Sequence, residues 1–251
     1  MAELTDLRYK IKKYYKLTSF EIKGLAIAII SIAFAISFND WGAKTFDPAV
    51  GLFNLFNALL ITLLSILVHD SGLRIWGLAM GYRIEYKMWT YGIVISVVLA
   101  FITRGNFWLI VPGGFLLHHL AGERLGFFRY GINFLAQSMI ALGGNLFTLV
   151  LIIVLKILNS ISPNALLQKA IIFNVIYLIT NMLPIPPLDG SKIFFGSRMI
   201  YMFVMPAIIA AAFLLIVDIP IIISLILSML IGMILWIVYY INFEKKIWKG
   251  P

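Results

Sequence analysis

The sequence predicts an all-α polytopic membrane protein with about six transmembrane helices and one re-entrant hairpin. Three observations predict this class. Of the 251 residues, 62% are hydrophobic and only 12% are charged, whereas a soluble domain carries roughly 25% charged residues. The apolar residues form long runs. The basic residues gather beside the first and last of these runs, and the length suits one compact bundle.

The predicted elements follow in order along the chain. A polar, basic cytoplasmic segment at 1–22 precedes a single transmembrane bundle at 23–243, and a basic tail at 244–251 comes last. An apolar run of about 20 residues can cross the hydrocarbon core of a bilayer as a helix. The predicted spans are 23–38, 51–82, 130–158, 166–183, 192–217 and 221–242. The second span has a charged helical tail through Lys87, and Pro206 is expected to kink the fifth span.

Two shorter apolar pieces, 89–103 and 107–117, lie between the second and third spans. Arg104-Gly105-Asn106 separates them, and Pro112-Gly113-Gly114 interrupts the second piece. Neither piece has the length of a straight span. We therefore expect a re-entrant hairpin, a backbone that is tolerated at membrane depth only against protein or a wet cavity.

The Lys and Arg residues predict the orientation, because cytoplasmic loops are enriched in them. Both termini are expected in the cytoplasm, with His69 and Asp189 towards that side. A polar turn with basic residues, at His118-His119 and Glu123-Arg124, also falls on that side. The loops at 40–47 and 159–164, which hold almost no basic residues, are expected outside. The flanking basic residues are Arg8, Lys10, Lys12, Lys13, Lys16, Lys245, Lys246 and Lys249.

The net charge of +9 is explained by these flanking residues, which attract anionic lipid headgroups. We therefore expect the lipid bilayer as a partner and no nucleic acid. The chain contains no cysteine, which excludes disulfides and thiolate chemistry.

Ionisable side chains within apolar helices are costly in a bilayer and mark functional positions. His69 and Asp70 lie near the end of an apolar run. Asp189 lies about 120 residues later, directly after a proline-rich stretch. Asn145 and Asn181 lie within apolar helices and need hydrogen-bond partners there.

Four motifs occur in order between residues 51 and 200. They are His69-Asp70-Ser71-Gly72-Leu73, Val111-Pro112-Gly113-Gly114, Ala141-Leu142-Gly143-Gly144-Asn145 and Asn181 to Gly190. Together they resemble the site-2 protease family of intramembrane zinc metalloproteases, in its compact archaeal-type form. The first resembles the family's H-E-x-x-H, the second a Pro-Gly loop element and the third A-G-P-x-x-N. The fourth matches N-x-x-P-x-x-x-L-D-G nearly intact.

The resemblance implies that His69 and Asp189 are metal ligands and that Asp70 stands at the position of the general base. It also places Asn145, Asn181, Pro112, Gly113 and Gly114 beside the active site. Two histidines at i and i+4 share a helix face, and a catalytic zinc takes three protein ligands and a water.

Leu73 stands where the second histidine should be and cannot coordinate a metal, so the motif is degenerate. Zinc is possible, but we expect its binding to be weak or absent. A rescued site would need His118 or His119 as the third ligand.

Each position also has a purely structural interpretation. Asp70 can pair with Arg74 at i+4. Asp189 can cap the following helix, and this capping role is the one we expect. Asn145 and Asn181 can join helices through hydrogen bonds. His118 and His119 can be an interfacial pair outside the core.

The sequence therefore leaves open whether the protein is an enzyme. The main prediction is a catalytically impaired pseudoprotease that binds transmembrane segments or a membrane partner by strand addition at the hairpin. One alternative is an active zinc-dependent intramembrane protease with a rearranged site. The other is a structural subunit of a larger membrane complex.

Overall fold

The computed structural model describes residues 2–42, 46–120, 133–217 and 219–246. The helices before the paired strands and between them are α1 (Ala2–Tyr14), α2 (Ser19–Ser37), α3 (Pro48–Ala79) and α4 (Thr90–Ile102). The strands are β1 (Tyr82–Met88) and β2 (Gly113–His119). The later helices are α5 (Phe134–Ile161), α6 (Ala165–Asn181), α7 (Asp189–Gly196), α8 (Arg198–Ile216) and α9 (Ile221–Tyr239), which a π-helical turn (Tyr240–Glu244) extends. The predicted turn at Glu123-Arg124 lies outside the described residues.

The protein is an all-α polytopic membrane protein, as predicted. Five helices are long and apolar enough to cross a membrane: α2, α3, α5, α8 and α9 with its π-helical extension. α4 and α6 are apolar but shorter. Polar caps start two of the long helices: Thr18 and Glu21 form a capping box at α2, and Asp47 accepts hydrogen bonds from Ala49 N and Val50 N at α3.

The region predicted as a re-entrant hairpin contains a helix between two paired strands. α4 occupies the first apolar piece, whereas part of the second piece is β2, which pairs antiparallel with β1. The charged tail of the second span was wrongly predicted as helical, because it is β1. Tyr82, Ile84 and Tyr86 are buried in alternation along this strand, the period of two that a sheet requires.

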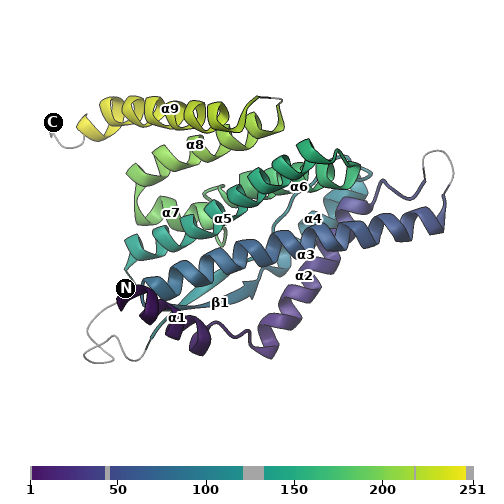
Figure 1. Cartoon of the computed structure of the whole chain (residues 1–251), viewed down its shortest axis with the longest axis horizontal. Helices are drawn as coiled ribbons and strands as arrows, with labels where there is room; N and C mark the ends of the chain where they lie inside the picture. Colours follow the sequence, from purple (N-terminus) through teal and green to yellow (C-terminus); the bar gives the residue numbers. More distant parts are fainter. Residues whose placement is uncertain (1, 43–45, 121–132, 218, 247–251) are drawn as a thin grey trace.

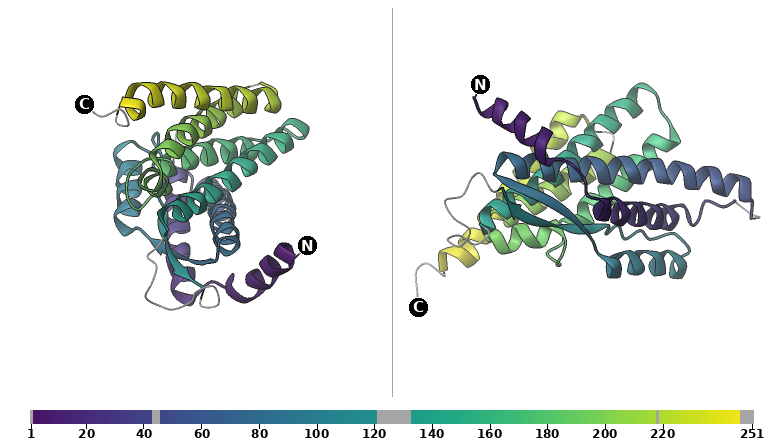
Figure 2. Two further views of the ribbon diagram at one scale, coloured as in Figure 1. Left: turned by 90° about the vertical axis from the view of Figure 1, so that its left-hand side faces the viewer. Right: turned by 90° about the horizontal axis from the view of Figure 1, so that it is seen from below.

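The elements, arranged as in Figure 1, surround a cluster of buried apolar side chains. α3 packs along α5 and against α2, while α5 also packs against α6 and α7. The paired strands lie beside α3 and α2, as the turned views in Figure 2 also show. Both termini lie at one end of the molecule, and the connections after α2, α5 and α8 lie at the other (Figure 1).

The predicted fifth span is divided in two at Ser197. This residue has an extended backbone and accepts a hydrogen bond from Ile200 N, so it caps α8. Pro206 lies inside α8. α8 then packs against α9 through small residues of α9, of which Ser228 and Gly232 are buried. A Cβ at Gly232 would lie 2.7 Å from Ala207 Cβ, so close helix packing requires glycine there.

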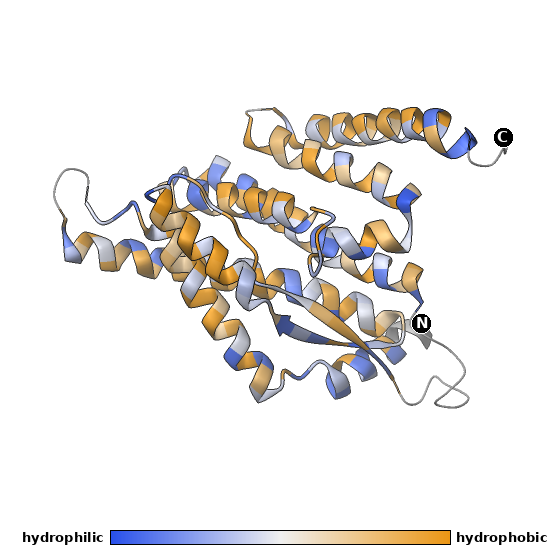
Figure 3. Cartoon of the chain, turned by 180° about the vertical axis from the view of Figure 1, so that it is seen from behind, coloured by the Kyte–Doolittle hydropathy of each residue, from blue (hydrophilic) through white to orange (hydrophobic). Residues whose placement is uncertain are grey.

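Large apolar side chains remain exposed on the outer faces of the helices, α9 above all. Figure 3 shows this apolar character along α8 and α9. A bilayer solvates such surfaces, which agrees with membrane embedding.

Candidate functional site

The loop between α6 and α7 positions Asp189. α6 ends at Asn181, and a loop containing Pro184, Pro186 and Pro187 turns the chain into α7. The turn is tight: a Cβ at Gly190 would lie 2.2 Å from Met182 O, so only glycine fits. Asp189, the first residue of α7, is thereby held beside the end of α6, with only 3% of its surface exposed.

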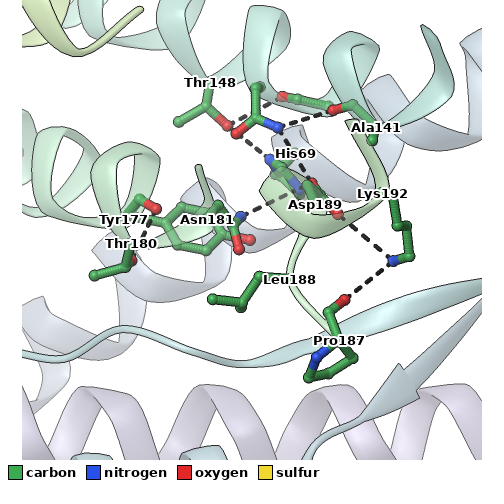
Figure 4. Close-up of polar contacts among 12 residues, drawn as sticks. His69, Ala141, Thr148, Tyr177, Thr180, Asn181, Pro187, Leu188, Asp189 and Lys192 are labelled. Carbon is green, nitrogen blue, oxygen red and sulfur yellow. Dashed lines mark hydrogen bonds and ion pairs between the residues drawn. The ribbon is translucent and has the colours of Figure 1, made fainter. Parts of the chain in front are cut away.

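His69 and Asp189 meet directly in the interior (Figure 4). His69 Nε2 lies 2.9 Å from Asp189 Oδ2, and His69 Nδ1 lies 3.0 Å from Thr148 Oγ1 on α5. The imidazole also lies edge-on to the ring of Tyr177. The structure thus brings together two residues that are 120 positions apart in the sequence.

Asn145 and Asn181 complete the surroundings of this pair. Asn145 Nδ2 donates to Asp189 Oδ2 at 3.3 Å and to Ala141 O, while Asn181 Nδ2 lies 3.4 Å from His69 Nε2. The structural interpretation of Asp189 as a helix cap is wrong, because Leu188 occupies the N-cap position and α7 has no side-chain cap. The carboxylate instead contacts groups from α3, α5 and α7.

Lys192, one turn after Asp189, was not recognised in the sequence. Its Nζ lies 3.8 Å from Asp189 Oδ1, donates to Pro187 O at 3.1 Å and sits 3.5 Å from the centroid of the Phe115 ring. Burial lowers the pKa of Lys192 to about 8, although the Asp189 carboxylate opposes that shift. α7 is outside the five candidate spans. The i,i+3 spacing was the available sequence signal for this contact.

Leu73 lies where the resemblance requires a second histidine. Leu73 is 5% exposed and packs against Gly144. A Cβ added at Gly144 would lie 2.8 Å from Leu73 Cδ2 and 2.9 Å from His69 Cε1. The helix face therefore presents one imidazole and one isobutyl group to the site.

Asp70 belongs to a buried ion network. Arg74 Nε donates to Asp70 Oδ2 at 2.6 Å, and Arg74 Nη2 donates to Glu21 Oε1 at 2.5 Å. Arg74 Nη1 also donates to Ile84 O, and Glu21 accepts from Tyr86 N at 2.9 Å. The structure thus contains the i+4 pair that was one interpretation of Asp70. Glu21 was missed, because its capping box with Thr18 indicates a helix start and not a partner on α3.

A small cavity of about 20 Å³ lies between these groups. His69, Asp70, Leu73 and Asp189 line it, and the predicted Pro112-Gly113-Gly114 element forms its opposite side. This volume is sufficient for one water molecule. Asp70 Oδ1 is buried and has no hydrogen-bond partner among the described residues, so it can accept from such a water.

The structure does not bring His118 or His119 to this cavity. His118 Nε2 lies 2.7 Å from Glu85 Oε2 across the strand pair, with half of its side chain exposed. The His119 ring lies against Tyr82. Within the described ranges, no three His, Cys, Asp or Glu side chains are grouped to hold a metal.

The residues present do not fit a catalytic zinc. Two ligands of a tetrahedral zinc lie about 3.4 Å apart when both bonds are about 2.1 Å, whereas His69 Nε2 and Asp189 Oδ2 are at hydrogen-bonding distance. A third protein ligand is lacking among the described residues. What the arrangement provides is a satisfied His–Asp pair, an ion-paired Asp70 and space for a water.

Comparisons with known proteins give one distant relative. A protein of Methanocaldococcus jannaschii with the name "Putative zinc metalloprotease" is 29% identical over 189 residues, which cover 71% of this chain and 85% of the relative. No family model and no solved structure matches the chain. The similarity agrees with a site-2-protease-like membrane protein.

Proposed function

We propose that this site-2-protease-like membrane protein binds an extended segment of a membrane-protein partner and does not hydrolyse it. Two observations carry the proposal: buried Leu73 stands at the position of a ligand, and His69 Nε2 lies at hydrogen-bonding distance from Asp189 Oδ2. Hydrolysis in metalloproteases needs a zinc-bound water activated by a base. Here Asp70, at the position of that base, is held by Arg74 in the ion network.

A strand edge without backbone partners supports the binding role. Leu120 N donates to Gly81 O and Trp89 N donates to Pro112 O, at the two ends of the β1–β2 ladder. In an antiparallel pair, every second residue directs its backbone N–H and C=O towards the partner strand, and the residues between them direct theirs away from it. With the observed register, the backbone groups of Phe115 and Leu117 therefore face away from β1.

Side chains hydrogen-bond the outer edge of β1, whereas the outer edge of β2, which is buried at Phe115 and Leu117, has no such partner among the described residues. Glu21 accepts from Tyr86 N and Arg74 donates to Ile84 O. Among the described residues, no backbone hydrogen bond reaches the outward groups of Phe115 and Leu117. An extended peptide can add to such an edge by main-chain hydrogen bonds. Gly113 and Gly114, which start β2, line the cavity that holds His69, so an added strand would run beside the former catalytic position.

Metal content and peptide turnover test the proposal together. We expect purified wild-type protein to hold far less than one zinc per chain and to bind, but not cleave, a peptide with a transmembrane segment. Leu73→His should raise the zinc content, because it supplies the i+4 imidazole. Adding Asp70→Glu tests whether cleavage returns. Leu67→His is the matched control, since Leu67 is an exposed residue of the same helix and its imidazole would not complete the site.

Two results would contradict the proposal. The first is stoichiometric zinc in the wild type that is lost in His69→Ala, together with peptide cleavage, which would establish the active protease. The second is unchanged peptide binding after Leu117→Pro, which blocks strand addition by removing an outward N–H. Circular dichroism of each variant checks whether its helical fold is retained.

A further inference from the structure

A second cavity lies at the opposite end of α6 from His69 and Asp189. Its volume is about 640 Å³, and it is formed by α3, the segment around Trp108 and the first turns of α6. The 17 residues of α6 extend about 25 Å at 1.5 Å per residue. The cavity is therefore separate from the candidate site and independent of the proposed function.

The cavity presents one positive and one negative charge. Lys169 Nζ is ion-paired with Asp40 Oδ2 and lies 5.9 Å from the centroid of the Trp108 ring. Asn54 Nδ2 donates to Asp40 O at 2.8 Å. Both charged side chains are only partly buried, so a polar ligand can reach them. The pair gives the cavity a dipolar lining with no net charge.

Two amide side chains in the cavity wall, Asn57 and Gln168, have no hydrogen-bond partner among the described residues. Asn57 is half-buried on α3, and Gln168 is exposed in the first turn of α6. Both amides can therefore bind water or a polar ligand. Their position next to the Lys169–Asp40 pair gives the cavity both charged and neutral hydrogen-bonding groups.

An apolar cavity of about 350 Å³ continues from the polar one and shares Trp108 and Ile172 with it. Ile176 and Ile179 extend this wall. Because residues three and four apart lie on one helix face, these isoleucines form a single stripe with Lys169 along α6. The result is a corridor that is polar at one end and apolar along the rest.

We propose that this corridor binds a zwitterionic phospholipid. The phosphate would lie at Lys169 and the ammonium at Asp40, with Asn57 and Gln168 donating to phosphate and ester oxygens. One acyl chain would follow the isoleucine stripe. The polar cavity has the size of a small-molecule site, whereas a transmembrane helix has a diameter of about 10–12 Å and needs a wider groove. Charge and shape therefore favour a lipid over a partner helix.

The test uses full-length protein, delipidated in detergent and then titrated with phosphatidylethanolamine or with diacylglycerol that carries the same acyl chains. Native mass spectrometry counts the bound lipid. We expect one tightly held phosphatidylethanolamine per chain and weaker binding of diacylglycerol, which lacks the charged headgroup. Lys169→Met should weaken phosphatidylethanolamine binding about tenfold, as expected for loss of one charge-assisted hydrogen bond. Ile176→Trp should weaken binding of both lipids by filling the apolar part.

Matched controls are Lys23→Met, an exposed lysine on α2, and Leu230→Trp, an exposed residue of α9. Both should bind lipid as the wild type does. Equal affinity for the two lipids in the wild type would overturn the proposal, and this comparison needs no variant to fold. Unchanged binding in folded Lys169→Met and Ile176→Trp would also overturn it. So would a co-purified membrane protein that crosslinks to a probe at position 57 and displaces the lipid.

Discussion

At the scale of single residues, the atom that faces His69 Nε2 decides the chemistry of the site. Asp189 Oδ2 occupies that position at 2.9 Å. A carboxylate oxygen at hydrogen-bonding distance therefore occupies the side of the imidazole on which a metal would bind. Leu73 adds no ligand. The pair is consequently a buried hydrogen bond that joins α3 to α7.

Asp189 should therefore respond to substitution as a buried hydrogen-bonding group and not as a helix cap. Asp189→Ala leaves a buried imidazole N–H without an acceptor, which costs about 1–3 kcal/mol of unfolding free energy. Asp189→Asn should cost less, because its amide oxygen can still accept from His69. Unfolding in detergent micelles, followed by circular dichroism, measures both.

Zinc content should be measured on the same Asp189 variants. Equal loss of stability in Asn and Ala, with metal released from both, would show a metal ligand and contradict this account. Ser191→Ala provides a control on the same short helix, since Ser191 is buried but bonds only to Leu188 O.

At the scale of elements, the Glu21–Arg74–Asp70 network joins α2, α3 and β1. All three residues are buried, with at most 6% of their surface exposed. Arg74 also donates to Ile84 O, and Glu21 accepts from Tyr86 N. Buried charges are stable only when they are paired. The network therefore fixes β1 against the helices.

Removing one member of this network should be more damaging than removing all three. Arg74→Met leaves two buried carboxylates facing each other and should cost about 3–5 kcal/mol. The triple variant Glu21→Gln, Asp70→Asn and Arg74→Met should recover part of this loss, because it buries no charge. Unfolding free energies of five proteins form the test: the wild type, the three single variants and the triple variant. Strict additivity of the single effects would contradict a coupled network.

At the scale of the whole molecule, both termini lie towards the same end of the bundle (Figure 1), on opposite sides of it (Figure 2). The basic residues that flank the first and last spans are at this end in the sequence-based prediction. Figure 3 shows apolar residues along the intervening helices. The placement of both termini in the cytoplasm stays a prediction.

Single-cysteine labelling tests the orientation, and the native chain has no cysteine to interfere. We expect Tyr9→Cys and Glu244→Cys to react only with a reagent that has crossed the membrane. Ser160→Cys, in the connection after α5, should react from outside. External labelling at position 9 or 244 in intact cells would show that a terminus is not cytoplasmic. The control is a membrane protein of known orientation in the same membrane that carries a single free cysteine.

The sequence by itself located the long apolar helices, because burial in lipid requires long apolar runs whatever their partners are. Of the six predicted spans, the one at 166–183 is the shorter helix α6 and the one at 192–217 is divided at Ser197. The sequence also identified His69 and Asp189 as a pair through the motifs that contain them. It did not identify β1, because Arg83, Glu85 and Lys87 were interpreted as a helix tail. Their alternation with buried Tyr82, Ile84 and Tyr86 was the available signal of a strand.

Only the tertiary structure decided what each polar side chain does. Asp70 was compatible with a base or with an ion pair, and the choice depends on Glu21, which reaches Arg74 from another helix. Asp189 had the sequence context of a cap, yet His69 and Asn145 hold its carboxylate. Local sequence determines helix formation through hydrogen bonds between near neighbours. Side-chain partners come from elements far apart in the chain, so packing alone establishes them.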